Sequence, residues 1–398
     1  MEAPLETKPI SETHSLRDLS LLFLKLGTTA FGGPAAHTAM MEDEVVRRRN
    51  WFSHAEFLEM VAATNLIPGP SSTQLAIYIG LRRNGVMGLV SAGLCFILPA
   101  VVLTLLIGML YERLGGLTEF TSVMFGIRAA VVAIVLATVY RLGNKTMRDP
   151  FNLLLGLAIA MLFLFHVNEI LLLFFAGLAG VAWSNRHHLK RSSSNSLGSV
   201  LLLLGIPAIA FPVVARSGVV GETLSLSQLG LSFLKIGATL YGGGYVLLAF
   251  LQHEFVDLHQ WLSQSQLMDA VAIGQFTPGP VLSTATFVGY LLLGLPGPGV
   301  ATVAIFLPSF LFVFVLGRLV TRLKSSKLLR GFLDGVQAAA LGLMLGVAVT
   351  LGLSGLTSPI AIGIFLVSLL LLFRTKLNTI WIIAGSGAIG YLSRLAFP

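Results

Sequence analysis

Phe23-Leu24-Lys25-Leu26-Gly27 returns later in the chain as Phe233-Leu234-Lys235-Ile236-Gly237, and 233 minus 23 gives an offset of 210 residues. A register that persists over a long stretch is the signature of an internal repeat. After one deletion the offset becomes 209, so that Gly126 aligns with Gly335. The sequence therefore predicts two homologous repeats in one chain. The offset of 210 also aligns Gly32-Gly33 with Gly242-Gly243, Glu44 with Glu254, Trp51 with Trp261, and Pro68-Gly69-Pro70 with Pro278-Gly279-Pro280.

The composition places these repeats in a lipid bilayer. Of the 398 residues, 55% are hydrophobic and only 11% are charged, and the mean hydropathy is +0.85. A water-soluble globule cannot bury so much apolar surface. The apolar runs are continuous and do not alternate, which favours membrane-spanning helices over a barrel. We expect an all-α polytopic membrane protein whose spans include the runs at 94–109, 129–139, 153–165, 171–181 and 360–373.

Polar stretches divide the chain into regions. Residues 1–15 predict a short cytosolic tail with no removable signal peptide, and the first repeat follows over residues 16–183. The basic, serine-rich stretch 184–199 predicts a linker to the second repeat, which occupies residues 200–398 with repeat homology from about residue 226. About seven apolar segments separate the two repeat starts, and the seventh lies at 200–214. Because seven is odd, the second repeat should be inverted relative to the first.

Loop charges support the inverted arrangement. With a cytosolic amino terminus, most basic loops fall on the cytosolic side, as the positive-inside rule requires. Arg47-Arg48-Arg49 joins them only if the segments around Gly32 and Pro68 are broken or re-entrant and return to the side that they entered. Inverted repeats with broken helices are typical of secondary transporters, whose substrate site lies near the midplane where the repeats meet. The other basic loops contain Arg82-Arg83, Arg141 with Lys145 and Arg148, Arg186 with Lys190 and Arg191, the 318–330 cluster, and Arg374 with Lys376.

Each repeat contains two Gly- and Pro-rich breaks with the chemistry of an anion site. Irregular backbone at membrane depth is tolerated only inside protein or beside a watery cavity. A helix that starts at a proline points free N–H groups and its positive dipole end at such a cavity, and the hydroxyls beyond it suit capping positions. The predicted substrate-binding positions are Gly32, Gly33, Asn65, Pro68, Gly69, Pro70, Ser72 and Gln74 in the first repeat, with Gly242, Gly243, Gln275, Pro278, Gly279 and Pro280 in the second.

A cation must complete this site. Two helix termini carry roughly +0.5 of a charge each and offset only about half of a dianion. Lys25, Lys235 and Arg128 are the candidates, because a cation inside a membrane segment is costly and has a functional interpretation by default. The alternatives are that the two lysines snorkel to an interface and that Arg128 pairs with a carboxylate. Glu44 and Glu254 are candidates for proton coupling, although structural ion pairs are favoured for them.

The motifs together resemble the chromate ion transporter family in its two-domain form. The resemblance covers essentially the whole chain and implies a multi-pass protein of the bacterial cytoplasmic membrane that exports chromate and confers chromate resistance. Sulfate is implied as an analogue or coupled ion, the bilayer is the other expected partner, and a homodimer is left open. The matching stretches are 23–34, Trp51, the Pro-Gly-Pro run at 68–80, Gly126-Ile127-Arg128-Ala129-Ala130, and the second copy at 233–290.

Energetics agree with export by a secondary transporter. Against an interior that is negative by about 100 mV, expelling a dianion gains about 4.6 kcal/mol, twice the value for one charge. That free energy sustains roughly a thousandfold gradient. The membrane potential or the proton gradient is therefore a sufficient drive, and the sequence contains no phosphate-loop motif for ATP.

Other functional classes fit the residues less well. We expect no enzyme, because the hydrolase and metalloprotease motifs are missing and Cys95, the single cysteine, has no evident base. No cofactor or metal is expected either, since His187-His188 falls in the polar linker. The net charge of +8 falls mostly in short loops, which is a topology signal and not a nucleic-acid surface. The alternative is an exporter of another small solute, such as an amino acid or another inorganic anion.

Overall fold

The computed structural model describes residues 15–184, 224–241, 244–316, 326–375 and 377–396, and every regular element in these ranges is a helix. The predicted linker and the apolar segment at 200–214 lie outside the described residues. Within them, four helices are long and apolar enough to cross a membrane. They form two equivalent pairs, which confirms the all-α polytopic fold with two repeats. These four spans are Ser71–Leu114, Thr118–Asn144, Pro296–Val315 and Leu328–Gly355.

The two repeats contain corresponding elements. Residues at offsets of 210 and 209 begin and end equivalent helices, so α1 matches α9 and α5 matches α15 at both ends. The first repeat contains α1 (Leu16–Thr29), α2 (Gly33–Glu42), η1 (Asp43–Arg48), α3 (His54–Thr64), α4 (Ser71–Leu114), α5 (Thr118–Thr146), α6 (Pro150–Leu164) and α7 (Glu169–Ser184). The second contains α9 (Leu226–Thr239), η2 (Gly244–Val246), α10 (Leu247–Leu251), η3 (Gln252–Leu258), α11 (Gln264–Phe276), η4 (Val281–Ser283), α12 (Thr284–Leu293), α13 (Pro296–Leu316), α15 (Lys327–Gly355), α16 (Pro359–Arg374) and α17 (Thr379–Ala396).

Equivalent serines start equivalent helices. Ser53 caps α3 and Ser263 caps α11, each in a capping box with the residue three positions later. This reciprocal pairing satisfies two of the backbone N–H groups that a helix start leaves without an intrahelical partner. The local sequence thus fixes where the short third helix of each repeat begins.

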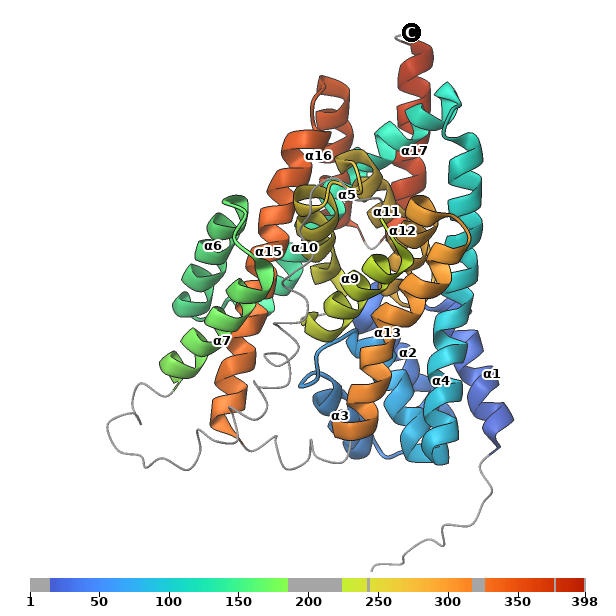
Figure 1. Ribbon diagram of the computed structural model, residues 1–398, viewed down its shortest axis with the longest axis vertical. Coiled ribbons are helices and arrows are strands. Elements are labelled where there is room, and N and C mark those ends of the chain that lie inside the picture. Colours follow the sequence, from blue (N-terminus) through green and yellow to red (C-terminus); the bar gives the residue numbers. More distant parts are fainter. Residues whose placement is uncertain (1–14, 185–223, 242–243, 317–325, 376, 397–398) are drawn as a thin grey trace, which may run out of the picture.

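The second repeat is inverted. In Figure 1, the longer cyan-to-teal part of α4 rises from the lower end of the molecule to the upper end, whereas α13, the counterpart of that part in the second repeat, descends. The re-entrant interpretation also holds, because α3 lies at the lower end, where α1 begins. At 1.5 Å per residue the 14 residues of α1 span about 21 Å, less than the roughly 30 Å of a bilayer core. Arg47, Arg48 and Arg49 therefore stay on the side of the amino terminus.

Each repeat also carries a break that we did not predict from the sequence. The long element α4 runs from Ser71 to Leu114, but Asn84 and Gly85 within it leave helical geometry, with φ of 60° at Gly85. Gly294, its repeat partner, has φ of 65° and separates α12 from α13. Glycine adopts this conformation without the steric cost that a side chain would add. Gly80 then packs against Gly88, and Gly289 packs against Gly297, so the long segment of each repeat consists of two antiparallel helices joined at a sharp turn.

The last helices of each repeat pack on the other repeat. The α6–α7 hairpin packs against α15, and the α16–α17 hairpin packs against α5. Small residues allow these close approaches, as is usual between membrane helices. Gly126 meets Gly390, and at the equivalent contact Gly335 meets Gly180. The repeats are therefore interlocked and not merely placed side by side.

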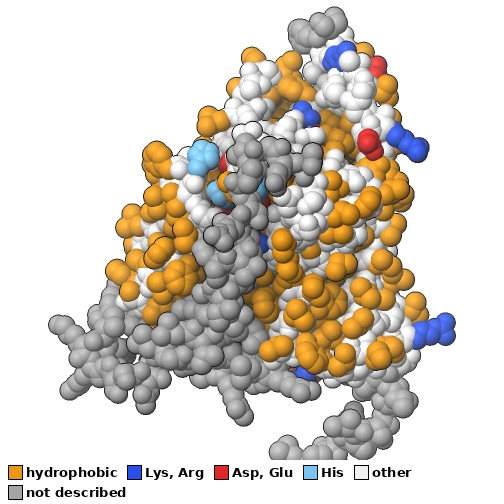
Figure 2. Space-filling model, viewed as in Figure 1, with side chains coloured by type: hydrophobic (Ala, Val, Ile, Leu, Met, Phe, Trp, Pro, Cys, Tyr) orange, Lys and Arg blue, Asp and Glu red, His pale blue; other side chains and the backbone are white. Residues whose placement is uncertain are grey.

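The outer surface suits lipid. Leucines on one face of α4, such as Leu94, Leu98 and Leu106, each leave more than half of their surface exposed. Figure 2 shows the same pattern over the flank of the molecule, where hydrophobic side chains dominate and charged ones are few. Aliphatic side chains exposed in this number are expected only where lipid is the solvent.

Candidate substrate site

The two Pro-Gly-Pro breaks form hydrogen bonds between the two repeats. The backbone N–H of Gly69 donates to the carbonyl of Leu240, 2.6 Å away, and the N–H of Gly279 donates to the carbonyl of Ala30 at 2.9 Å. Ala30 and Leu240 are the residues at which α1 and α9 end. Each break therefore satisfies a helix-end carbonyl of the opposite repeat, and the predicted meeting point of the repeats is a pair of symmetric hydrogen bonds.

Glycine is required at both of these positions. Gly69 has φ of 127° and Gly279 has φ of 86°, values that a residue with a side chain rarely adopts. A Cβ atom at Gly279 would also lie 3.1 Å from both Ala100 Cβ and the Gly27 carbonyl oxygen. Gly279, in the second of the two motifs, is thus required both by its backbone geometry and by the close approach of α1 and α4.

A cavity of about 80 Å³ opens beside this junction. One water molecule needs about 10–15 Å³ of such space, so the cavity has room for several waters or for the five heavy atoms of a tetrahedral oxyanion. Both repeats contribute to its wall, and none of the described residues that line it carries a carboxylate. The polar residues and glycines of the lining are Gly32, Gly33, Thr138, Arg141, Gly274, Gln275, Thr277, Gly279, Asn378 and Thr379.

The amino-terminal end of α2 faces this cavity through Gly32 and Gly33. Gly32 is the cap residue and provides no side-chain hydrogen bond, and Pro34 follows in the first turn. The N–H groups of this first turn are therefore open to a ligand, and the helix dipole favours a negative one. This end of α2 has the features that we predicted for the first break. At the second break the predicted capping hydroxyls are not used, because Pro70 is the cap residue of α4 and no side chain caps that end.

Arg141 is the cation of the cavity, and we did not predict it as a site residue. Its position near the carboxyl end of α5 led us to assign it to a basic loop, but α5 continues to Thr146. One guanidinium N–H group donates to the carbonyl of Leu372 on α16. Since arginine has five N–H donors, the others remain to bind an anion. A basic residue just inside the end of a long apolar span was the only sequence signal for it.

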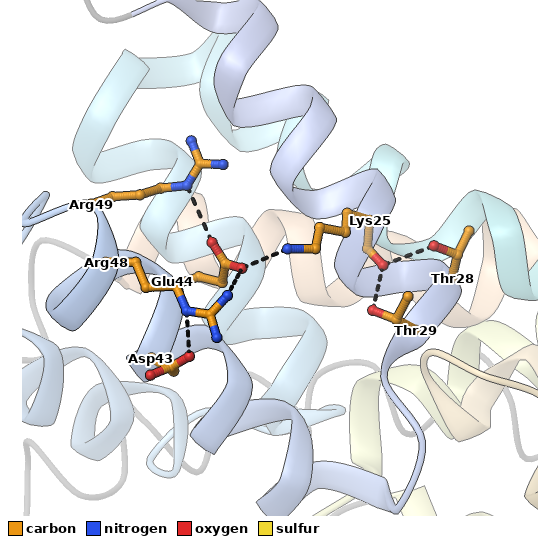
Figure 3. A network of polar contacts seen from close by, with 7 residues as sticks. All are labelled: Lys25, Thr28, Thr29, Asp43, Glu44, Arg48 and Arg49. Carbon is orange, nitrogen blue, oxygen red and sulfur yellow. Dashed lines mark hydrogen bonds and ion pairs between the residues drawn. The ribbon is translucent and has the colours of Figure 1, made fainter.

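The two predicted lysines hold the glutamates that recur with them. Lys25 Nζ lies 2.8 Å from Glu44 Oε1, and Lys235 Nζ lies 2.6 Å from Glu254 Oε2. In Figure 3, Arg48 and Arg49 approach Glu44 from the opposite side. The favoured ion-pair interpretation is therefore what the structure shows for both glutamates. It also means that neither lysine offers an uncompensated charge to a substrate.

Arg128 is likewise paired. Its Nε and Nη2 atoms each lie 2.7 Å from one oxygen of Asp269 on α11, and the Tyr111 hydroxyl donates to the same carboxylate at 2.7 Å. The alternative that Arg128 binds a carboxylate is thus the observed geometry. Asp269 is fully buried, and Arg128 borders a second cavity of about 390 Å³ together with Ser263, Gln264 and Ser354. This ion pair joins α5 of one repeat to α11 of the other.

The remaining predicted positions surround the junction. Gln74 is fully buried and donates to the carbonyl of Pro68 at 2.5 Å, and Ser72 is also buried. Asn65 caps the end of α3, and Pro280 caps η4. Gly242 and Gly243 lie outside the described residues. Of all the predicted positions, Gly32, Gly33, Gln275 and Gly279 line the cavity directly.

These features define a class of protein. Two inverted repeats that meet at broken helices, with a polar cavity between them, form the architecture of secondary transporters. The sequence relationships then give the family. The chain belongs to the chromate transporter family, whose model matches residues 17–181 and 227–391 and so finds each repeat separately.

Full-length relatives agree with this assignment. The chain is 36% identical over 388 residues to a chromate transport protein of Cupriavidus metallidurans, covering 96% of this chain and 94% of the relative. It is 33% identical to a probable chromate transport protein of Synechococcus elongatus, with 86% of each chain covered. An uncharacterised transporter of Bacillus subtilis matches only 34% of this chain but 70% of its own length, at 29% identity. No solved structure matches the chain.

Proposed function

We propose that this protein exports chromate across the bacterial cytoplasmic membrane and thereby confers chromate resistance. The cavity at the repeat junction supports the proposal most directly, since it combines Arg141, hydroxyls and the open end of α2 without a carboxylate. Such a lining fits a small oxyanion, with sulfate as a chemically similar competitor. An amino acid would require a carboxylate opposite its ammonium group, and the described lining provides none.

Arg141, Gln275 and the glycines at 32, 33 and 279 contact the anion in this proposal. Lys25, Lys235 and Arg128 act indirectly, because each is already held by a carboxylate. The membrane potential supplies the drive, with the amino terminus and the basic loops in the cytosol. Expelling two negative charges from a negative interior releases free energy in every cycle.

The test is efflux of labelled chromate from preloaded cells, with and without excess sulfate and with the potential collapsed. A charge-assisted hydrogen bond contributes about 1.5–3 kcal/mol, so Arg141→Gln should weaken transport roughly tenfold to a hundredfold at subsaturating chromate. Arg148→Gln is the matched control, since it removes the same charge from an exposed position just beyond the end of α5. Equal efflux from Arg141→Gln and wild type would refute the site. Efflux no faster than from cells without the protein would refute the function.

A further inference from the structure

The pseudo-symmetry of the repeats leads to a second site opposite the cavity. At the offset of 209, Arg141 of the cavity corresponds to Thr350, and at the offset of 210 that aligns α7 with α17, Thr379 of the cavity corresponds to Glu169. The equivalent place on the other side of the junction therefore has a hydroxyl where the cavity has the Arg141 cation, and a carboxylate where the cavity has the Thr379 hydroxyl. A place with that chemistry suits a cation instead of an anion.

Glu169 is a buried carboxyl group that lacks hydrogen-bond donors. It is the first residue of α7, it is 0% exposed, and neither of its oxygens has a hydrogen-bond partner in the described structure. The nearest titratable group is the imidazole of His253 on η3, whose Nε2 lies 3.4 Å from Glu169 Oε2. His253 is itself only 8% exposed.

The surrounding charges do not neutralise this pair. Lys235, the nearby cation, is already bound to Glu254 at 2.6 Å, and Asp257 adds a negative charge that Gln252 holds at 2.9 Å. His166 lies near His253, and His259 is directed at Glu254. A buried ionised carboxylate without donors is strongly disfavoured, so Glu169 and His253 must hold one proton between them while they are buried.

We propose that the Glu169–His253 pair is the proton-binding site of this transporter and that one proton enters the cell for each chromate that leaves. The inference rests on the proposed chromate export and specifies its coupling ion. The proton binds to the pair from the outer side and is released to water on the inner side, and no other bond changes. Each cycle then moves three charges in the favourable direction, two by the dianion and one by the proton.

Reconstituted vesicles provide a quantitative test. With the membrane potential clamped at zero and both sides alkaline enough to keep chromate a dianion, a vesicle interior more acidic by one pH unit should accumulate chromate tenfold at equilibrium. Glu169→Gln, which keeps the shape but cannot release a proton, should bring the ratio to one. Glu119→Gln, an exposed carboxylate on α5, is the matched control and should keep the tenfold ratio.

The outcomes separate this inference from the proposed function. Wild-type vesicles that exchange chromate but ignore the pH gradient would overturn the proton site and leave chromate transport intact, whereas vesicles with no chromate flux would overturn the function itself. Tenfold depletion would show symport and also overturn the inference. If Glu169→Gln does not fold, wild-type protein in weakly buffered detergent gives an independent measurement, because chromate binding should release protons. Binding without proton release would count against the pair.

Discussion

Neutralising Asp269 should destabilise the protein far more than removing the whole ion pair. Asp269 is 0% exposed and holds Arg128 through two contacts of 2.7 Å, while the Arg128 side chain keeps 27% of its surface exposed. Breaking a buried pair on one side costs about 3–5 kcal/mol, and the residual exposure of Arg128 places Asp269→Asn near about 3 kcal/mol. The double variant Arg128→Gln/Asp269→Asn leaves no charge unpaired and should lose only about 1 kcal/mol.

Unfolding of the purified variants in detergent measures these differences as a double-mutant cycle, with a coupling free energy of at least about 2 kcal/mol expected. If the double variant is as unstable as the sum of the single variants, the pair does not act as a unit and the reasoning fails. Transport by the same variants separates structure from function. We expect Arg128→Gln to abolish chromate transport while membrane insertion is kept, so normal transport by the stable double variant would make the pair purely structural.

Further predictions concern the equivalent ion pairs of the two repeats and the glycine at the repeat junction. Lys235→Gln should cost about 3 kcal/mol of unfolding free energy or more, because Glu254 has no second Lys or Arg within 4.0 Å in the described chain. Lys25→Gln should cost less than about 1 kcal/mol, because Arg48 and Arg49 remain beside Glu44. Thermal unfolding of the two variants tests the ranking, and equal losses would contradict it. Gly279→Ala should cost about 1–3 kcal/mol through its positive φ, and a variant with wild-type stability and chromate efflux would show that the junction tolerates a side chain.

The parts of the fold that follow from repetition could be predicted from the sequence. The shared register of Pro68-Gly69-Pro70 and Pro278-Gly279-Pro280 placed the breaks, and the parity of the apolar segments predicted the inversion. Both are properties of sequence order and hydropathy. The hydrogen bonds from Gly69 to Leu240 and from Gly279 to Ala30 could not be predicted, because they join residues whose distance depends on how the repeats interlock.

Charge pairing was the part of the site that sequence could not resolve. Arg128 was identified as a costly intramembrane cation, yet its partner Asp269 is 141 residues away and is positioned by α11 of the other repeat. Arg141 was missed for a related reason, since a basic residue near a span end is usually a topology signal. Only the packing of the α16–α17 hairpin against α5 turns it toward the cavity.

The two repeats occupy different environments, and this difference has a mechanical consequence. Leu58 on α3 is 51% exposed, whereas its repeat partner Met268 on α11 is 4% exposed, so α11 is packed against α5 while α3 is not packed in the equivalent way. In transporters with inverted repeats, access alternates when one repeat rocks against the other. We expect this motion to make the two repeats exchange their packing environments. With Cys95 replaced and spin labels placed on α3 with α15, and on α11 with α5, chromate and an imposed gradient should shorten the first distance as they lengthen the second. Two distances that stay fixed or change in the same direction would show that the asymmetry is a permanent feature of the fold and not one state of a transport cycle.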